Sequence, residues 1–174
     1  SRYQKVKVEL PDFENTPFET NNLENFIEAS KEVLSRLSVC SQKGLVEMFD
    51  SSIGNGTVLS PYGGKTLGTE TEGMAALIPV LGCETTTASV MSYGFNPVIS
   101  SWSPYHGAIY AVVESVAKII AMGGDYHTIR FSFQEYFEKL LDNPSKWGKP
   151  FAALLGAYTA QKALQLPSIG GKDS

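Results

Sequence analysis

The sequence predicts an α+β protein in which helices cover a mixed, mostly antiparallel sheet. Two observations lead to this prediction. Short apolar segments rich in β-branched residues, bounded by Gly, Pro and Thr, indicate strands. Longer segments with helical periodicity indicate helices that pack against them. With 174 residues, 43% of them hydrophobic, the chain is long enough to bury a core.

The N-terminal part predicts an arm and two helices. Alternating apolar and charged residues over 3–13 indicate a short strand or an extended arm. Residues 21–39 predict an amphipathic helix capped by Asn21 or Asn22. One face of this helix collects Leu23, Phe26, Ile27, Ser30, Leu34 and Leu37. A second, short helix is expected within 43–52, and the glycine-rich residues 54–56 end it.

Beyond residue 56 the pattern alternates between strands and buried helices. Residues 57–68 predict a strand followed by a turn, and further strands are expected at 73–80, 86–94 and 127–133. Residues 107–124 predict a helix that is apolar on almost every side and ends in the Gly123-Gly124 pair. A long helix should begin at about Pro150, a favourable first-turn residue, and residues 167–171 should form a last strand.

The overall composition excludes several classes of protein. The net charge is −4 and the basic residues form no stripe, so nucleic acid is not an expected partner. Cys40 and Cys83 are far apart and form no CxxC pair, which argues against a disulfide framework and structural zinc. We find no signal peptide, and no apolar run approaches the roughly 18 residues of a membrane span. A cytoplasmic protein is therefore expected.

Two glycine-rich stretches could bind ligands. The last residues are GGKDS, which offer unhindered backbone N–H groups, a cation and a hydroxyl to a phosphate, although the Walker spacing is absent. The alternative is a plain turn. Residues 63–73 carry two carboxylates, Glu70 and Glu72, which could hold Mg²⁺. Here the alternative is a solvated loop.

Two charged residues within the apolar helix, and the two histidines on either side of it, need a separate explanation. Glu114 and Lys118 are four residues apart and so share one face of the helix over 107–124. Such a pair is costly among apolar residues unless it is satisfied, so we interpret it as a structural ion pair rather than a ligand site. His106 and His127 lie in no catalytic motif, and we interpret them as surface or helix-capping residues.

The order of these stretches resembles the phosphoribosylformylglycinamidine synthase family, also called formylglycinamide ribonucleotide amidotransferase. The resemblance rests on four segments: EMFDSSIGNGTVLSP, SPYHGAIYAVVESVAKIIAMGGD, IRFSF and LPSIGGKDS. The resemblance covers roughly residues 39–174, and the sequence is similar to the large single-chain type of this family. It implies a domain similar to the N-terminal domain of aminoimidazole ribonucleotide synthetase, in the N-terminal part of the second synthetase half. Residues 1–38 are then a connecting arm and helix, and the chain is a fragment of a larger enzyme.

The resemblance also implies a reaction. The parent would be an ATP-dependent ligase that converts formylglycinamide ribonucleotide to the amidine in purine synthesis, with Mg²⁺ and ammonia from glutamine. Its other synthetase domains and its glutaminase domain would be the partners. The fragment is expected to be inactive and to hold no cofactor tightly, although it could form a homodimer. The first half of the family carries a His-Asn-His-Pro catalytic motif, whereas this chain has Phe95-Asn96-Pro97, so no catalytic residue is expected.

The site residues follow from the same resemblance. In relatives whose second half holds an auxiliary nucleotide, Glu114 matches a metal-binding carboxylate, Lys118 replaces a metal-binding asparagine, and Glu72 is the nearest counterpart of a metal-binding aspartate. An ammonium cannot ligate a cation, so this site should be degenerate and hold no metal. The closing residues Gly171 and Ser174 match groups that contact nucleotide and substrate, with Asp173 between them.

Two alternatives stay open on the sequence alone. The chain could belong to another member of the same ATP-binding superfamily, such as a thiamine-monophosphate kinase, a selenophosphate synthetase or a hydrogenase maturation protein. Those proteins need an aspartate-rich Mg-ATP motif, which residues 60–90 lack. The chain could also be a non-catalytic packing or dimerisation domain of such a protein.

Overall fold

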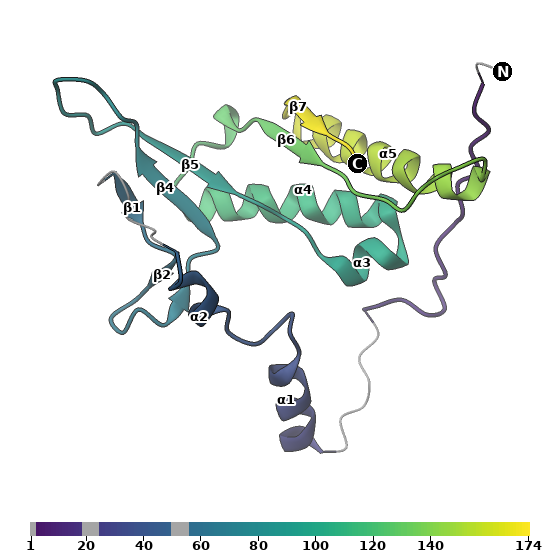
Figure 1. Cartoon of the computed structure of the whole chain (residues 1–174), viewed down its shortest axis with the longest axis horizontal. Coiled ribbons are helices and arrows are strands. Elements are labelled where there is room, and N and C mark those ends of the chain that lie inside the picture. Colours follow the sequence, from purple (N-terminus) through teal and green to yellow (C-terminus); the bar gives the residue numbers. More distant parts are fainter. Residues whose placement is uncertain (1–2, 19–24, 50–55) are drawn as a thin grey trace.

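The computed structural model describes residues 3–18, 25–49 and 56–174. Two long helices, α4 (Pro104–Ala121) and α5 (Pro144–Leu164), lie side by side and form the centre of the molecule. A three-stranded sheet packs on α4, and a pair of parallel strands lies beside the two helices (Figure 1). Within the described ranges, no helix is long and apolar enough to cross a membrane.

The described strands confirm the α+β class but divide into three small sheets rather than one. The first sheet is antiparallel in the order β1-β4-β5, with bounds Thr57–Leu59, Gly73–Leu77 and Ala88–Ser92. The second is a hairpin of β2 (Tyr62–Gly63) and β3 (Thr69–Glu70). The third pairs β6 (Phe131–Gln134) with β7 (Ser168–Lys172) in parallel. Among the described strands, no pairing joins β1, β4 or β5 to β6 or β7, so the single sheet that was expected is divided.

Helix α4 forms where the sequence predicted it. The Ser103 hydroxyl oxygen caps its N-terminus by accepting from the backbone N–H of His106, and Pro104 opens the first turn. The helix ends before Gly123, whose φ of +86° is a backbone conformation that glycine adopts without strain. The cap is thus Ser103, and His106 lies in the first turn that Ser103 caps.

Helix α5 begins six residues earlier than the sequence analysis predicted. Asn143 accepts from the backbone N–H groups of Ser145 and Lys146, and Pro144 is the first helical residue. The cap and this proline together fix the start, so Pro150 lies inside the helix. Because proline has no backbone N–H, the helix lacks one internal hydrogen bond at that point.

The two long helices approach closely because small residues line their contact. A Cβ added to Gly156 on α5 would lie 2.1 Å from the carbonyl oxygen of Tyr105 on α4, so any larger residue would separate the helices. The core contains buried residues from both helices and from β6 and its flanks: Val112, Val116, Ile129, Phe131, Ala160 and Leu166. Val112 is the most deeply buried, at 1% exposure. Burial of these side chains holds β6 against α4 and α5.

Shorter elements differ from the prediction at several points. Helix α1 spans Phe26–Ser35 and is capped by Asn25, whereas the predicted caps Asn21 and Asn22 and the residue Leu23 lie outside the described residues. Helix α2 is only Lys43–Val46. Of the predicted break at 54–56, only Gly56 is described.

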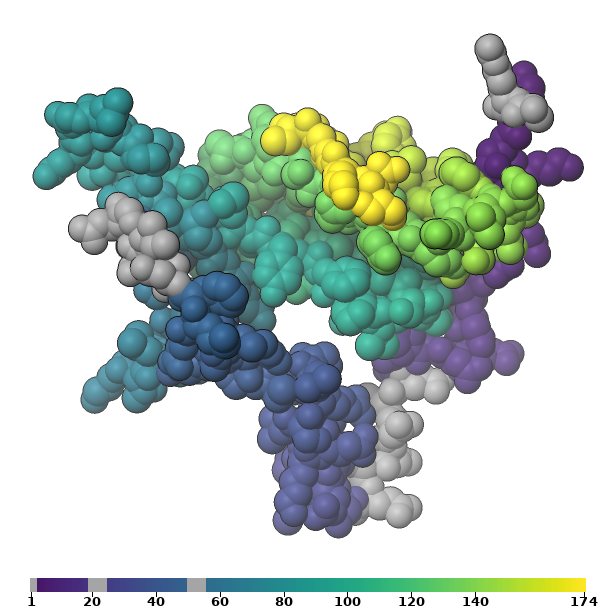
Figure 2. Space-filling model, viewed as in Figure 1, coloured from purple at the N-terminus to yellow at the C-terminus, as the bar shows by residue number. Residues whose placement is uncertain are grey.

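Two further elements were not expected in this form. Helix α3 (Pro97–Trp102) was not predicted, and Asn96 caps it by accepting from the backbone N–H groups of Val98 and Ile99. A 3₁₀ turn, η1 (Tyr126–Thr128), precedes β6. The arm is irregular over residues 3–12, bends at 13–15 and turns at 17–18, and it pairs with no described strand. Figure 2 shows α1 projecting from the rest of the molecule, in agreement with its lack of any buried residue.

Candidate functional site

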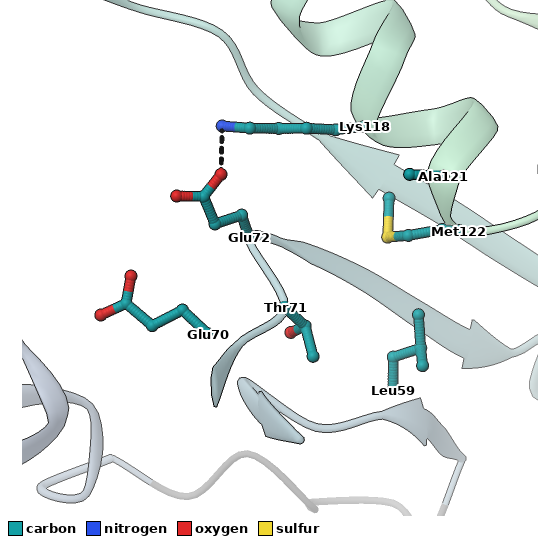
Figure 3. A pocket seen from close by; sticks show the side chains of 7 residues that line it. All are labelled: Leu59, Glu70, Thr71, Glu72, Lys118, Ala121 and Met122. Carbon is teal, nitrogen blue, oxygen red and sulfur yellow. Dashed lines mark ion pairs between the residues drawn. The ribbon is translucent and has the colours of Figure 1, made fainter. Parts of the chain in front are cut away.

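Three charged side chains meet at one face of α4. The ammonium nitrogen of Lys118 lies 2.7 Å from Glu114 Oε1 and 3.2 Å from Glu72 Oε2. The Lys118 side chain is only 15% exposed, while those of Glu114 and Glu72 are 37% and 54% exposed. Figure 3 shows Lys118 reaching from α4 to Glu72, in the turn between β3 and β4. We call Glu72, Glu114 and Lys118 the ion cluster.

The segment after β5 completes the surroundings of the ion cluster. Lys118 Nζ also donates to the Tyr93 carbonyl oxygen at 3.2 Å and lies 4.7 Å from the centre of the Tyr93 ring. Glu114 Oε2 accepts from the backbone N–H of Phe95 at 3.1 Å. Lys118 therefore contacts three oxygen atoms from three different parts of the chain. The role of Tyr93 was not anticipated, because a backbone carbonyl leaves no signal in the sequence.

Backbone geometry brings these groups together. Gly94 passes so close to α4 that a Cβ there would lie 2.0 Å from the carbonyl oxygen of Ala111. This contact places the flanking residues beside Glu114 and Lys118. Glu72 has a φ of +50°, in the left-handed region that non-glycine residues adopt at a cost. The ion pair with Lys118 helps to offset that cost.

The balance of burial and charge makes Lys118 a firmly protonated group. Burial alone would lower the pKa of Lys118, but the hydrogen bonds to Glu114 and Glu72 outweigh this effect and raise the pKa. The lysine is therefore positively charged at neutral pH. It neutralises one of the two carboxylates and leaves the ion cluster with a net negative charge.

An open pocket of about 460 Å³ lies beside the ion cluster. It is lined by Leu59, Glu70, Thr71, Glu72, Lys118, Ala121 and Met122, drawn in Figure 3. Leu59, Ala121 and Met122 supply apolar surface, whereas Glu70 already accepts a hydrogen bond from Tyr62 Oη at 3.1 Å. The pocket thus joins an apolar wall to groups whose charges and hydrogen bonds are largely satisfied.

The ion cluster does not fit a magnesium ion. Mg²⁺ needs oxygen ligands at about 2.0–2.1 Å in octahedral geometry. The ammonium of Lys118 instead occupies the position between the two carboxylates, and a protonated amine offers no lone pair to a metal. Among residues 3–18, 25–49 and 56–174, no group of three His, Cys, Asp or Glu side chains is arranged to hold a metal ion.

The C-terminal residues form a strand rather than a free loop. Gly171 belongs to β7, and a Cβ there would lie 2.5 Å from the carbonyl oxygen of Phe133 on β6. Ser174 continues the pairing: its N–H donates to the Glu135 carbonyl at 3.1 Å, and its carbonyl accepts from Phe137 N–H at 2.9 Å. The expected phosphate loop is thus already hydrogen-bonded as extended backbone. None of its residues lines the pocket beside Lys118.

Side chains at this end of the chain form a second small charged group. Burial raises the pKa of Glu135, and the negative charge of Asp173 raises it further. Lys172 Nζ donates to Ser174 Oγ. All five residues of β7 are exposed, so Gly171, Asp173 and Ser174 are accessible to a ligand or to another domain.

The two histidines lie away from both groups. His106 Nδ1 is 2.8 Å from Ser103 Oγ in the first turn of α4. His127 lies in η1, where its backbone N–H donates to Asp125 Oδ1 at 3.0 Å. Neither contacts the ion cluster through any of these hydrogen bonds. Cys40 and Cys83 are both free thiols.

The fold and the ion cluster define an α+β domain whose central helix carries a closed charge network beside an open pocket. Two curated proteins are similar in sequence, each named phosphoribosylformylglycinamidine synthase subunit PurL. The one from Thermoplasma acidophilum is 26% identical over 113 residues, which are 65% of this chain and 14% of that protein. The one from Thermoplasma volcanium is 24% identical over 146 residues, 74% of this chain and 19% of that protein.

These similarities confirm, at the level of the family, the resemblance that the motifs indicated. No protein-family model matches the chain. The matched segment spans less than a fifth of the length of either relative. The division at residue 38, the single-chain type and the assignment to the second half stay predictions.

Proposed function

We propose that this chain is part of a phosphoribosylformylglycinamidine synthase, the enzyme named in both similar proteins. In that setting the parent is a ligase of purine synthesis that uses ATP, Mg²⁺ and ammonia from glutamine. Residues 39–174 are its synthetase N-terminal-like domain. We assign the chain an architectural role within the parent and no independent turnover.

The ion cluster is the observation that carries the architectural role. A Mg²⁺ ion that held a nucleotide here would have to lie between the two carboxylates. Lys118 Nζ now lies at that position, 2.7 Å from Glu114 and 3.2 Å from Glu72. The Lys118 ammonium supplies the positive charge that a bound metal ion would otherwise supply, and it does so without any binding step. The cluster therefore joins α4 to the β3–β4 turn without any ligand.

The C-terminal group has a different proposed role. Gly171, Asp173 and Ser174 stand on exposed backbone beside β6, where a phosphate-bearing ligand could reach the Ser174 hydroxyl group, while the Ser174 N–H stays bonded to Glu135. We propose that they form one wall of a substrate or nucleotide site that other domains of the parent complete. Lys172 stands beside them as a nearby cation.

Exposed apolar surface supports a role in assembly. Large apolar side chains are exposed on and near β5, among them Met91 at 59%, Tyr93 at 67% and Phe95 at 62%. Patches of this kind mark surfaces that another protein surface covers. We propose the remaining synthetase domains and the glutaminase domain as partners, with a homodimer when the chain is isolated. The same surface also fits the second candidate, a packing domain with no part in the active site.

Calorimetric titration with Mg-ADP tests the architectural assignment. The wild-type chain should give no binding heat in the micromolar range. Lys118→Asn replaces the ammonium by a neutral oxygen ligand, so this variant should gain Mg²⁺ affinity at Glu72 and Glu114. Lys162→Asn on α5 is the matched control and should gain none. Micromolar binding to the wild-type chain would show that the lysine does not close the site.

Turnover of the parent enzyme separates the two candidate functions. Ser174→Ala should reduce synthesis of the amidine if the C-terminal group contacts substrate or nucleotide. The control is Ser168→Ala, at the start of β7 and outside the proposed group. Unchanged turnover in Ser174→Ala would favour the packing domain. A parent that makes no amidine at all, even in its wild-type form, would overturn the proposed function itself.

A further inference from the structure

The N-terminal arm, residues 3–18, is attached to the folded part of the chain at separate points. The first is near Lys7, whose backbone N–H donates to the carbonyl oxygen of Pro144 at 2.9 Å. There the arm crosses α5 so closely that a Cβ on Gly148 would lie 2.0 Å from the Lys7 carbonyl oxygen. This glycine therefore makes room for the backbone of the arm.

The second point of attachment is an aromatic cluster. Trp102, the last residue of α3, donates its indole Nε1–H to the Asp12 carbonyl oxygen at 2.7 Å. The rings of Phe13 and Phe18 meet the Trp102 ring edge-on, with centroids 5.6 Å and 5.9 Å away. Phe18 also lies 5.6 Å from the ring of Tyr110 on α4. Edge-on aromatic pairs of this spacing are favourable beyond the area that they bury.

The receiving surface is a compact patch on two helices. The rings of Trp102 and His106 lie 5.1 Å apart, and Phe13 meets His106 edge-on at 6.1 Å. Together with Tyr110 they present three rings and one indole N–H to the arm. We call Trp102, His106 and Tyr110 the aromatic patch.

We propose that residues 3–18 are a docking strap and that the aromatic patch is a binding site for a peptide with two phenylalanines five positions apart. The occupant is the chain's own arm. A passive linker would need neither a glycine opposite Lys7 nor an indole hydrogen bond to Asp12. The arm predicted as a connection is thus a ligand of the domain that follows it.

The strap is held at few points and so should open locally. Most of its residues are exposed, and Phe13 and Phe18 keep 65% and 50% of their surface accessible to solvent. Segments with few buried contacts open without unfolding the core. Because the strap belongs to the same chain, its effective concentration at the patch is far above that of a free peptide.

The sequence provides an internal reference for a test. It has two tryptophans, and both indole N–H groups donate to backbone carbonyls: Trp102 to Asp12 and Trp147 to Leu141, each at 2.7 Å. Hydrogen exchange of the two indole protons, followed by NMR on the whole chain, therefore reports the aromatic attachment of the strap at Trp102 together with an indole on α5 that is bonded to Leu141 instead. The double variant Phe13→Ala/Phe18→Ala should speed exchange at Trp102 by about tenfold and leave Trp147 unchanged.

A peptide added in trans tests whether the patch is a site in its own right. A synthetic peptide of residues 3–18 should slow exchange at Trp102 in the double variant, and the same peptide with both phenylalanines replaced by alanine should not. Phe26→Ala on α1, where Phe26 is 75% exposed, is the control substitution and should leave both indoles as in the wild type. Unchanged Trp102 exchange in the double variant, or no response to the wild-type peptide at millimolar concentration, would overturn the proposal.

A second variant guards against a general loss of structure. Gly148→Ala places a methyl group against the Lys7 carbonyl and should speed exchange of the Lys7 amide proton. Since alanine favours a helix, α5 should stay intact, and the Trp147 indole reports whether it does. An unaltered Lys7 amide in this variant would contradict the docked position of the strap.

Discussion

Lys118 and Glu114 occupy successive turns of α4, and the ammonium of the first lies 2.7 Å from the carboxylate of the second. The same ammonium reaches the Tyr93 carbonyl, and the same carboxylate reaches the Phe95 N–H. The pair therefore joins α4 to the segment after β5. Glu72 adds the β3–β4 turn to the same point.

Removal of the lysine charge should weaken the fold. In Lys118→Met the two carboxylates and the Tyr93 carbonyl lose their shared partner, and we expect a loss of about 1 to 2 kcal/mol in the free energy of unfolding, because the glutamates are partly exposed. Urea denaturation measures this loss. Lys31→Met, which removes an exposed partner of Glu28 on α1, should leave stability nearly unchanged. A loss equal to that of the control would mean that solvent already screens the cluster.

The ion cluster should also appear in the pH dependence of stability. The pKa of Lys118 is raised above its ordinary value of 10.5, so the folded state holds this proton more tightly than the unfolded state. The stabilisation is complete below pH 10.5 and is lost as the pH rises through the folded-state pKa. Between pH 9 and 12, the melting temperature of the wild type should therefore fall more steeply with rising pH than the melting temperature of Lys118→Met. Parallel curves would contradict the ion pair.

The contribution of Glu135 to stability should also be lost as the pH rises, but for a different reason. Its pKa is raised above 4.5 by burial and by Asp173, so its contribution to stability is present below pH 4.5 and is lost as the pH rises through the folded-state pKa. At pH 7 the charged side chain is unfavourable, and Glu135→Gln should stabilise the protein slightly, by no more than about 0.5 kcal/mol because solvent screens this partly exposed group. This advantage should vanish at pH 3.

Glu138→Gln is the matched control for this experiment. A hydrogen bond from Lys149 is the main cause that lowers the pKa of Glu138, so its loss at pH 7 should destabilise rather than stabilise. Thermal denaturation of both variants at pH 7 and pH 3 compares the two carboxylates directly. A gain in stability for both variants, or for neither, would contradict a charged form of Glu135 that burial and Asp173 disfavour in the folded protein.

Gly94→Ala tests the close passage of the chain over α4. The new methyl group would lie 2.0 Å from the Ala111 carbonyl oxygen, so the segment must move away from α4 and take Tyr93 and Phe95 with it. We expect a loss of about 3 kcal/mol in the free energy of unfolding. Gly170→Ala is the control, because no heavy atom lies within 4 Å of a Cβ at that position. Equal stability of the two variants would contradict the contact.

The sequence predicts the elements that have local signals. Helix α4 was located by its apolar residues and its closing glycines, and both are found in the structure. The start of α5 was missed because Pro150 and Pro144 are equally suitable first-turn residues, and the Asn143 side chain decides between them. Helix α3 was missed since it is only Pro97–Trp102, too short to show periodicity.

The site was predictable only in part. Helical spacing brought Glu114 and Lys118 to one face, and the structure forms that pair. The contact of Glu72 with Lys118 depends on the turn between β3 and β4, and the Tyr93 contact on a backbone carbonyl, so neither has a local signal. The division into three sheets is a property of tertiary packing, which single strands do not encode.

The parallel pairing of β6 with β7 has a consequence for the order in which the chain folds. All of α5 lies between the two strands, so β6 finds no strand partner until residues 168–172 have left the ribosome. During that interval Phe131 and Phe133 stand on an unpaired edge, and exposed edges of this kind recruit other chains. Synthesis that stalls within α5 would therefore yield an aggregation-prone intermediate, whereas a stall before β6 would not.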